Sequence, residues 1–234
     1  MCTHYTPATP QHLIALAELG GLGPLALPND HWPAETFPGY AAPILLRNPD
    51  GTAICALARF GLVPRWCRDA IQATTLSRRT YNARSETVAE KPSYRTPWRE
   101  RRFALAPMGH YFEPCWESGR AVRWRLHRSD HAPFAVAGLH EQWTDPLTGE
   151  QIRSFSLLTV NADAHPVLRR MHRVGDEKRQ LVVVPPTDFG RWLHASAADA
   201  RRMLLDMAGD NLTGEPAAPL ALSPDEAQQS LLDF

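Results

Sequence analysis

Cysteine is scarce in this chain, and long apolar runs and a net charge are both missing. The four cysteines, Cys2, Cys55, Cys67 and Cys115, contain no Cys-x-x-Cys pair, which argues against a zinc site and against a disulfide scaffold. No apolar run approaches the roughly 18–20 residues that a membrane helix requires. The N-terminus lacks a basic stretch followed by an apolar segment, so we expect a cytoplasmic protein without a secretory signal.

Signatures of bound cofactors are also missing. The sequence contains neither a P-loop nor the glycine-rich fingerprint of dinucleotide-binding proteins. His127 and His131 are four residues apart, but no acidic residue or cysteine completes a recognisable metal signature around them. We therefore expect no cofactor and no metal.

The zero net charge hides an uneven distribution. Lysine plus arginine number 25, as do aspartate plus glutamate, and 23 of the 25 basic residues are arginine. Between Arg59 and Arg128, fourteen arginines and Lys91 face six acids, a net charge of +9, whereas six acids and no basic residue follow Arg202. Tyrosines and tryptophans lie in the same basic span. Proteins bind single-stranded nucleic acid with cations that contact the phosphates and aromatic rings that stack on the bases.

Local patterns predict a set of short helices and strands. Pro10 to Leu19 reads as an amphipathic helix, and residues 20–40, rich in glycine and proline, read as a loop. Further helices are expected at 188–195 and 198–207. Strands are expected at 54–60, 102–106, 122–127, 134–139, 154–160 and 181–184. In residues 122–127, arginines and a histidine alternate with apolar residues, which predicts a half-exposed strand with a cationic outer face.

The order of these elements indicates the fold class. Strands do not alternate regularly with helices, which argues against a doubly wound parallel sheet. We expect an α+β fold with a curved antiparallel sheet or barrel-like core and flanking helices. Residues 1–207 would form one domain. Residues 208–234, rich in glycine, proline, alanine and acids, are predicted to form a flexible acidic tail.

Cys2 carries the most distinctive chemistry. Because cysteine is small, we expect removal of Met1, which leaves Cys2 as the N-terminal residue. Its α-amine then has a pKa of about 7.7–8 and its thiol one of about 8.5. The amine forms a Schiff base with an aldehyde and the thiol closes a five-membered thiazolidine, so the two groups together trap an aldehyde durably.

Seven short segments follow Met1-Cys2 in a characteristic order: Phe60–Trp66, Tyr81–Thr87, Tyr111–Glu113, Phe134–Leu139, Leu158–Ala162, Arg170–His172 and Leu181–Pro185. With Cys2 in front, this order resembles the SOS-response-associated peptidase (SRAP) family of abasic-site processing proteins. The resemblance spans roughly residues 2–195. No single segment is diagnostic, but the ordered set is highly specific.

The resemblance implies a protein that binds single-stranded DNA and crosslinks covalently to abasic sites. Cys2 would be the nucleophile, and Asn82 would position the N-terminal amine and the sugar. Arg84 would hold a phosphate beside the lesion. Glu113 and His172 would move protons during sugar ring opening, Schiff-base formation and crosslink reversal.

The proton-transfer roles also have a chemical rationale. An abasic deoxyribose is mostly a closed hemiacetal, so an acid or base must open it before an amine attacks. Glu113 lies within the apolar stretch Tyr111–Pro114, where burial would raise its pKa. A histidine suits proton transfer near neutral pH. His165, seven residues before His172, is an alternative shuttle.

The expected DNA contacts come from the basic, aromatic span and from residue 4. They are His4, Trp66, Arg78, Arg79 and Arg84. The family commonly begins Cys-Gly-Arg, whereas this chain begins Cys2-Thr3-His4. A titratable histidine would replace a fixed cation, so we expect His4 to contribute charge mainly below neutral pH.

Three hypotheses remain open at this point. The leading one is a crosslinking protein that acts as a monomer, with autoproteolytic or aminopeptidase removal of Met1 and accompanying peptidase and lyase activities. The second is a conventional cysteine peptidase with Cys2 as nucleophile and His172 as base. The third is a non-catalytic single-stranded DNA-binding protein.

The last six residues suggest a further partner. They include Gln229, Leu232 and Phe234, which resemble the Gln-x-x-Leu-x-Phe peptide that binds the bacterial replication clamp. Glutamine would occupy a polar notch while the two apolar side chains fill a pocket beside it. Chance occurrence of the motif and folding of this segment back onto the domain are the alternatives.

Overall fold

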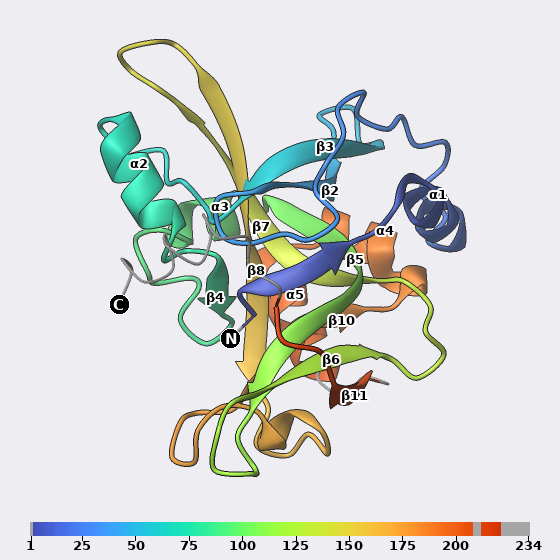
Figure 1. Cartoon of the computed structure of the whole chain (residues 1–234). Helices are drawn as coiled ribbons and strands as arrows, with labels where there is room; N and C mark the ends of the chain where they lie inside the picture. Colours follow the sequence, from blue (N-terminus) through green and yellow to red (C-terminus); the bar gives the residue numbers. More distant parts are fainter. Residues whose placement is uncertain (1, 208–211, 221–234) are drawn as a thin grey trace.

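A closed ring of strands forms the centre of the molecule. The computed structural model describes residues 2–207 and 212–220, which contain one eleven-stranded sheet with flanking helices (Figure 1). Five strands pair in a cycle, because the last also pairs with the first: β7 (Phe134–Thr144), β8 (Gln151–Asn161), β3 (Ala53–Phe60), β2 (Ala41–Arg47) and β5 (Phe103–Cys115). The sheet is therefore barrel-like, and the expected α+β class is confirmed.

The remaining strands extend this ring. β1 (His4–Pro7) and β6 (Val122–Arg128) pair with β5, and β11 (Leu212–Pro216) pairs with β6. Three short strands complete the sheet, with β4 (Asn82–Arg84) and β9 (Arg179–Leu181) on β8 and β10 (Val183–Val184) on β7. Most pairs are antiparallel, as expected, but β3 and β4 both run parallel to β8. The sheet is thus mixed.

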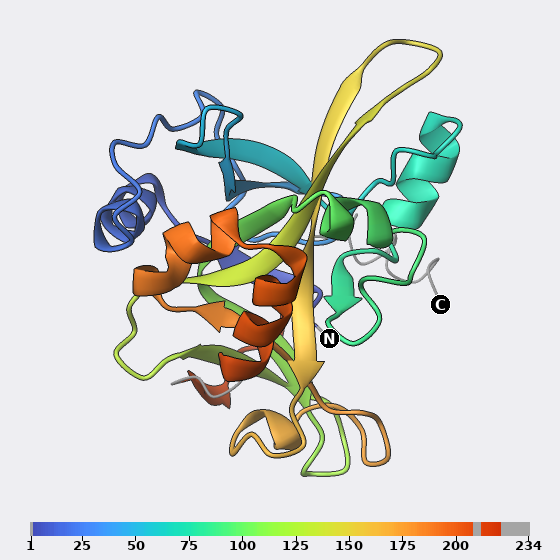
Figure 2. The ribbon, with the colours of Figure 1, turned by 180° about the vertical axis from the view of Figure 1, so that it is seen from behind.

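Alternating side chains divide the core into two clusters. Along β2, Ile44 and Leu46 belong to one apolar cluster, whereas Leu45 between them belongs to the other. This period of two places one cluster inside the ring and the other against the helices. Figure 2 shows α4 (Phe189–His194) and α5 (Ala197–Asp206) covering the outer side of the sheet. The Trp192 indole of α4 anchors that layer by donating to the Ala104 carbonyl oxygen at 2.9 Å.

The predicted helices agree with the structure. α1 spans Pro10–Leu19, as expected from the sequence, and buries Leu13, Leu16 and Ala17. It begins where Thr9 accepts a hydrogen bond from the His12 backbone N–H and Pro10 takes the first helical position, a favourable N-terminal arrangement. α4 and α5 match the other two expected helices closely.

The strand predictions are correct in place but incomplete. β1, β2, α2 (Ala70–Ser77) and α3 (Arg95–Arg99) were not expected, and two short 3-10 turns lie at Leu168–Arg170 and Pro186–Asp188. β5 continues to Cys115, well past the expected end at residue 106, through Pro107 and Gly109. The expected strand 181–184 divides at Val182, because Leu181 pairs with β8 and Val183 with β7.

The predicted tail differs from the structure in one segment. Residues 212–216 are not a free tail, because they form β11 and pair with β6 from Leu212 to Pro216. Backbone pairing along these five residues and burial of Leu212 account for this attachment. The rest of the predicted tail, including the clamp-like residues Gln229, Leu232 and Phe234, lies outside the described residues. Within the described part of the chain, no helix is long and apolar enough to span a membrane.

Candidate active site

Cys2 lies two residues before the first residue of β1 and is buried. β1 pairs antiparallel with β5, with His4 opposite Phe112, and this register carries Cys2 to the part of β5 that holds Glu113. The Cys2 side chain is 1% exposed, and its Sγ donates a long hydrogen bond of 3.5 Å to the His4 carbonyl oxygen. Burial and the negative charge of Glu113 raise the pKa of the Cys2 thiol well above its usual range. The thiol is therefore protonated at neutral pH.

Asn82 holds the backbone of Cys2. β4 places it opposite Leu157 of β8, and its Nδ2 donates to the Cys2 carbonyl oxygen at 2.7 Å. The Tyr94 hydroxyl in turn donates to the Asn82 carbonyl oxygen at 3.0 Å. The Asn82 Oδ1 atom is buried and has no hydrogen-bond partner among the described residues. This acceptor is available to a hydroxyl group or amine of a substrate.

Glu113 and His172 form a close pair beside Cys2. The His172 Nε2 lies 3.3 Å from the Glu113 Oε2, and the Glu113 side chain is 3% exposed. His172 adopts a left-handed conformation with φ of 63°, and its N–H donates to the Pro114 carbonyl oxygen at 2.7 Å. A non-glycine residue in this conformation stores strain, which is common at functional sites.

Burial shifts both members of this pair toward their neutral forms. It raises the pKa of the Glu113 carboxyl above its usual value. It also lowers the pKa of His172 to about 4, with nearby positive charges, Lys178 among them, acting in the same direction. A carboxyl that keeps its proton longer and a neutral imidazole form an acid and a base within contact distance.

The structure distinguishes the two candidate histidines. His165 is buried, and its Nδ1 accepts hydrogen bonds from the backbone N–H groups of Val167 and Leu168 at 3.1 and 3.0 Å. These bonds stabilise the turn that begins the 3-10 segment. His172, by contrast, lies 3.3 Å from Glu113.

Arg84 is exposed at the end of β4. Asn82 and Arg84 flank the buried Ala83, which agrees with the alternation expected of a strand. The Arg84 Nη1 lies 2.7 Å from the Glu177 Oε2, and the other oxygen of Glu177 lies 2.7 Å from the Nη1 of buried Arg179. Glu177 therefore positions Arg84, and a phosphate that binds Arg84 would have to compete with Glu177.

His4 is buried, which was not expected of a phosphate contact. Its ring stacks between Phe37 and Phe112, with centroid distances of 4.1 and 4.5 Å. The Nε2 lies 2.9 Å from Glu35 and the Nδ1 lies 3.3 Å from the guanidinium of Arg123. Burial is the main cause that lowers the pKa of His4, with Arg123 acting in the same direction and Glu35 opposing them. A lowered pKa agrees with a charge that appears only at acidic pH, and the role of His4 toward DNA stays a prediction.

The other expected DNA contacts lie on the segment between β3 and β4. Trp66 is 48% exposed and its indole donates to the Pro92 carbonyl oxygen at 3.3 Å. Arg78 and Arg79 follow α2 and are both exposed. No described contact joins Trp66 or Arg79 to the residues around Cys2. The side chains of Trp66, Arg78 and Arg79 all face solvent, where an extended ligand can reach them.

Sequence reasoning gave no role to two tyrosines of this site. The pKa of Tyr81 is raised first by burial and then by the charges of Glu113 and Cys2, which places its hydroxyl near both. Tyr94 anchors Asn82, as described above. The position of Tyr81 directly before Asn82 could have indicated that it belongs to the site, whereas nothing in the sequence connects Tyr94 with Asn82.

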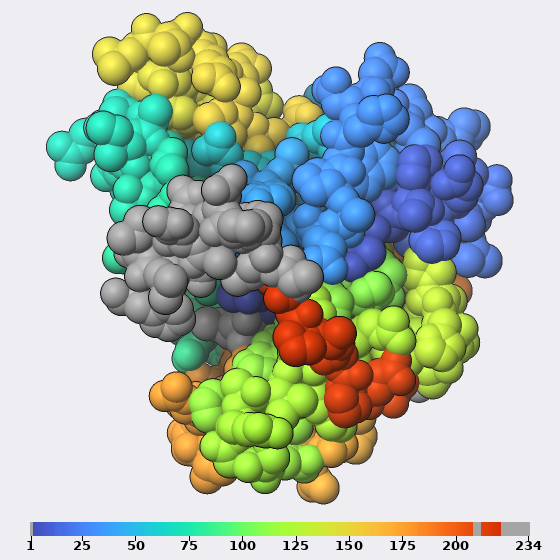
Figure 3. Space-filling view, viewed as in Figure 1, coloured from blue at the N-terminus to red at the C-terminus, as the bar shows by residue number. Residues whose placement is uncertain are grey.

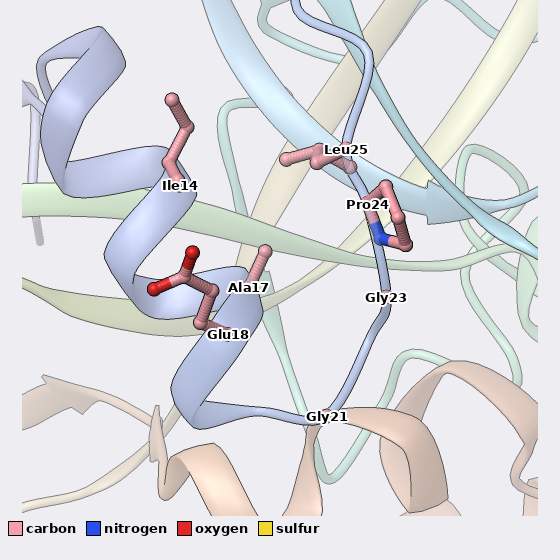
Figure 4. Close-up of a pocket in the computed structure, with 7 residues that line it drawn as sticks. All are labelled: Ile14, Ala17, Glu18, Gly21, Gly23, Pro24 and Leu25. Atoms are coloured by element: carbon pink, nitrogen blue, oxygen red, sulfur yellow. The ribbon is translucent and has the colours of Figure 1, made fainter.

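Other places in the described residues offer no comparable chemistry. They contain no group of three or more histidine, cysteine or acidic side chains that could hold a metal ion, and the four cysteines are free. A hollow of about 700 Å³ lies between α1 and the following loop (Figure 4). Its lining contains Glu18 as the only ionisable side chain among apolar residues and glycines, and none of the candidate site residues. We therefore place the candidate active site at Cys2.

Comparisons with known proteins identify the family of this chain. The family model of the SOS response associated peptidase (SRAP) matches residues 1–219. The abasic site processing protein YoaM of Bacillus subtilis is 25% identical over 181 residues, which cover 75% of this chain and 73% of that protein. The rat abasic site processing protein HMCES is 24% identical over 252 residues, covering 88% of this chain and 67% of that one.

Solved structures show the same fold. A crystal structure of a Bordetella bronchiseptica protein superimposes with a TM-score of 0.81 at 31% identity, covering 93% of this chain and all of the other. A Bacteroides thetaiotaomicron protein gives a TM-score of 0.75 at 21% identity, covering 96% of each chain, and supports the fold alone. Because the family model covers nearly the whole chain, this protein belongs to the SOS response associated peptidase family.

Proposed function

We propose that this protein processes abasic sites by binding single-stranded DNA and crosslinking covalently to the lesion through Cys2. The observation that carries the proposal is the group formed by buried Cys2 and Glu113 with half-buried Asn82 and His172, drawn from four distant parts of the chain. The names of the relatives, which describe abasic site processing, support the same substrate.

The chemistry begins after Met1 has been removed, either autoproteolytically or by an aminopeptidase. The closed deoxyribose opens to the aldehyde when the bond between its anomeric carbon and its ring oxygen breaks, with a proton added to the ring oxygen and a proton lost from the anomeric hydroxyl. The raised pKa of Glu113 suits it to supply the first of these protons. The α-amine of Cys2 attacks the aldehyde carbon, and loss of water gives the Schiff base. Neutral His172 accepts the proton that the amine loses.

The thiol completes the crosslink. Sγ of Cys2 adds to the imine carbon, its proton passes to the nitrogen, and the five-membered thiazolidine closes without any oxidant. Asn82 fixes the Cys2 carbonyl and offers its buried Oδ1 to the amine or the sugar hydroxyl. The Schiff base also permits β-elimination of the 3′ phosphate, which would be the lyase activity.

The electrostatics disfavour a conventional cysteine peptidase. Such an enzyme relies on a thiolate, which requires a thiol pKa below its ordinary value. Here burial raises the pKa of the Cys2 thiol and lowers that of His172 to about 4, so the neutral forms dominate at pH 7. Attack by the amine first, with the thiol giving its proton to the imine nitrogen as its sulfur adds, suits these shifts.

DNA would lie along the cationic side chains near Cys2. Arg84 would bind a phosphate beside the lesion, with Arg78, Arg79 and Trp66 further along the strand. His4 would act through the guanidinium of Arg123, which it contacts, rather than by its own charge. A monomer suffices for this reaction, because one chain supplies every group named.

A crosslinking assay tests the proposal. A uracil-containing oligonucleotide is treated with uracil glycosylase, incubated with the protein and analysed on a denaturing gel after heating. We expect a heat-resistant band of slower mobility with single-stranded abasic DNA and not with intact DNA. Reversible binding without such a band would support the non-catalytic alternative, and cleavage of casein without crosslinking would support the peptidase.

Variants of Cys2 separate the two nucleophiles. Cys2→Ala should abolish the heat-stable band while the affinity for single-stranded DNA stays within about two-fold, because affinity comes from phosphates and stacking. Cys2→Ser should still form a Schiff base, which borohydride traps, but no thiazolidine. A heat-stable crosslink in Cys2→Ala would exclude the mechanism. Cys67→Ala, which removes a buried thiol in another cluster, is the control.

A further inference from the structure

Two arginines and a histidine share one face of β6 and form a row along it. Arg123, Arg125 and His127 alternate with inward residues, so they share one face and are spaced about 6–7 Å apart. The row begins beside the candidate site, because an Arg123 Nη lies 3.3 Å from His4, two residues from Cys2. It then leads away from Cys2 along the strand.

The C-terminal strand β11 covers this row. Glu215 forms an ion pair with Arg125, and the same carboxylate oxygen lies 3.7 Å from the Nε2 of His127. Arg123 donates to the Ala218 carbonyl oxygen at 2.9 Å. Figure 3 shows residues 212–220, in red, on the surface against the light-green strands. Each side chain of the row thus lies against an oxygen atom of residues 215–218.

A small polar hollow lies next to the row. Its volume is about 240 Å³. Thr6 and His110 contact each other at 3.1 Å on its wall, and the rings of His127 and His131 stack at 4.5 Å. Its remaining lining residues are Pro7, Thr9, His12, Gly109 and Arg125. A wall of imidazoles, hydroxyls and a guanidinium presents hydrogen-bond donors, the groups that bind phosphate oxygens.

β11 is weakly attached for a strand. Leu212 is its one buried residue, and Glu215 and Pro216 are exposed. Exposed ion pairs such as that of Glu215 with Arg125 contribute little net stability in water. A short edge strand held this way can be displaced by a ligand that supplies more than one negative charge to the same cations.

We propose that Arg123, Arg125 and His127 form a second phosphate-binding surface for single-stranded DNA, which β11 covers with Glu215 in the place of a phosphate. DNA that reaches Cys2 continues along β6 and displaces residues 212–218. The acidic strand therefore weakens binding and selects for strands long enough to extend past the lesion. The proposal rests on the proposed function, since it takes the same DNA as its ligand.

The first experiment compares Glu215→Gln with Glu150→Gln in the full chain. Both remove one negative charge, but Glu150 lies on the exposed β7–β8 hairpin, away from β11 (Figure 1). For a fluorescent strand of about 20 nucleotides, Glu215→Gln should bind roughly three- to ten-fold more tightly and steepen the log–log salt slope by about 0.7–1.4, one or two phosphates. Glu150→Gln should behave as the parent does.

A second pair of measurements locates the effect. Adding Arg125→Gln to Glu215→Gln should remove the gain, and a strand of about five nucleotides, which the main site alone accommodates, should show no gain. Leu212→Ala, which loosens β11 without changing charge, should also tighten binding of the long strand. Equal affinities for parent, Glu215→Gln and Leu212→Ala would overturn the proposal.

Crosslinking of a short abasic strand keeps the two proposals apart. The parent and Glu215→Gln should crosslink it to the same extent, since Cys2 is unchanged. If the parent forms no crosslink, the proposed function fails, whereas the affinity gain for long undamaged DNA still decides the role of β11. If crosslinking occurs without that gain, only the second surface is excluded.

Discussion

The side-chain amide of Asn82 donates a hydrogen bond of 2.7 Å to the backbone carbonyl oxygen of Cys2, across eighty residues of sequence. This bond connects Cys2, two residues before the first residue of β1, to the first residue of β4. It fixes the direction of the Cys2 backbone, on which the positions of both the amine and the thiol depend. A free N-terminal residue would otherwise sample many orientations.

Loss of this bond should slow crosslinking more than it weakens binding. For Asn82→Ala we expect the single-turnover crosslinking rate to fall by up to about ten-fold, because a hydrogen bond between neutral groups is worth about 0.5–1.5 kcal/mol. The affinity for single-stranded DNA should change little. Asn161→Ala, which removes an exposed asparagine bonded to Asp163, is the control. An unchanged rate in Asn82→Ala would deny Asn82 its positioning role.

Arg84 should contribute one phosphate contact. Arg84→Ala is expected to weaken binding of single-stranded DNA several-fold at low salt and to reduce the log–log salt slope by about 0.7. Arg202→Ala, on exposed α5 with the same charge change, should leave both quantities unaltered. Fluorescence anisotropy at several salt concentrations measures them. Identical slopes for Arg84→Ala and the parent would show that Arg84 stays with Glu177 in the complex.

His140 should make stability depend on pH. Burial, with Arg153 and Arg65 acting in the same direction, lowers its pKa to about 4, against about 6.5 in the unfolded chain. Below pH 6.5 the unfolded state takes up a proton that the native state does not, so stability falls as the pH falls from 6.5 to 4. The free energy of unfolding should lose up to about 2 kcal/mol from His140 at pH 5.

Comparison of urea unfolding at pH 7.5 and pH 5 checks this contribution. His140→Gln should lose less stability between the two pH values than the parent does. The difference between the two proteins isolates His140 from the other groups that titrate, among them the buried Glu113, whose raised pKa acts in the opposite direction. The same pH dependence in both proteins would refute the shift.

Gly61 should tolerate no side chain. Its φ is +111°, and a Cβ there would lie 2.0 Å from the Ser77 backbone carbonyl oxygen. Gly61→Ala should therefore lower the free energy of unfolding by about 3 kcal/mol or more. Gly149 has a φ of +75°, but a Cβ there would meet no atom within 4 Å. Gly149→Ala should therefore lower the free energy of unfolding by only about 1 kcal/mol. Equal losses in urea denaturation would contradict the steric argument.

The C-terminal peptide should bind the replication clamp. A fluorescent peptide of residues 224–234 titrated with purified clamp should bind through Gln229, Leu232 and Phe234. Leu232→Ala and Phe234→Ala peptides should bind at least about ten-fold more weakly, since each removes an apolar anchor. Equal, weak binding by all three peptides would contradict the predicted clamp interaction. Tethering to the clamp would raise the local concentration of the protein at replication forks.

Several elements were predictable because their signals are local. α1 follows from Thr9, Pro10 and the spacing of its three buried apolar residues, all within one short segment. Strands with clear alternation, such as β6, are equally visible in the sequence. β2 escaped prediction because five consecutive buried residues around Pro43 show no period of two. The second half of β5 escaped because proline and glycine normally end a strand.

The residues of the candidate site were also predictable, but which of them contact one another was not. The order of short segments around Cys2, Asn82, Glu113 and His172 indicated the family, and the family model confirms it. Nothing in the sequence states that His172 rather than His165 contacts Glu113, or that His4 is stacked between two rings. Those facts depend on contacts between segments far apart in the chain.

Residue identities and short periodic patterns are enough to indicate the family, the chemistry available at Cys2 and the basic face of β6. Which of these groups lie together depends on the packing of distant segments. The pairing of β1 with β5 and of β4 with β8 brings Cys2, Asn82 and Glu113 into one buried space. The pairing of β11 with β6 sets an acidic strand against the cations. Strand register and burial, which set these contacts and the pKa of each group, arise only when distant segments pack.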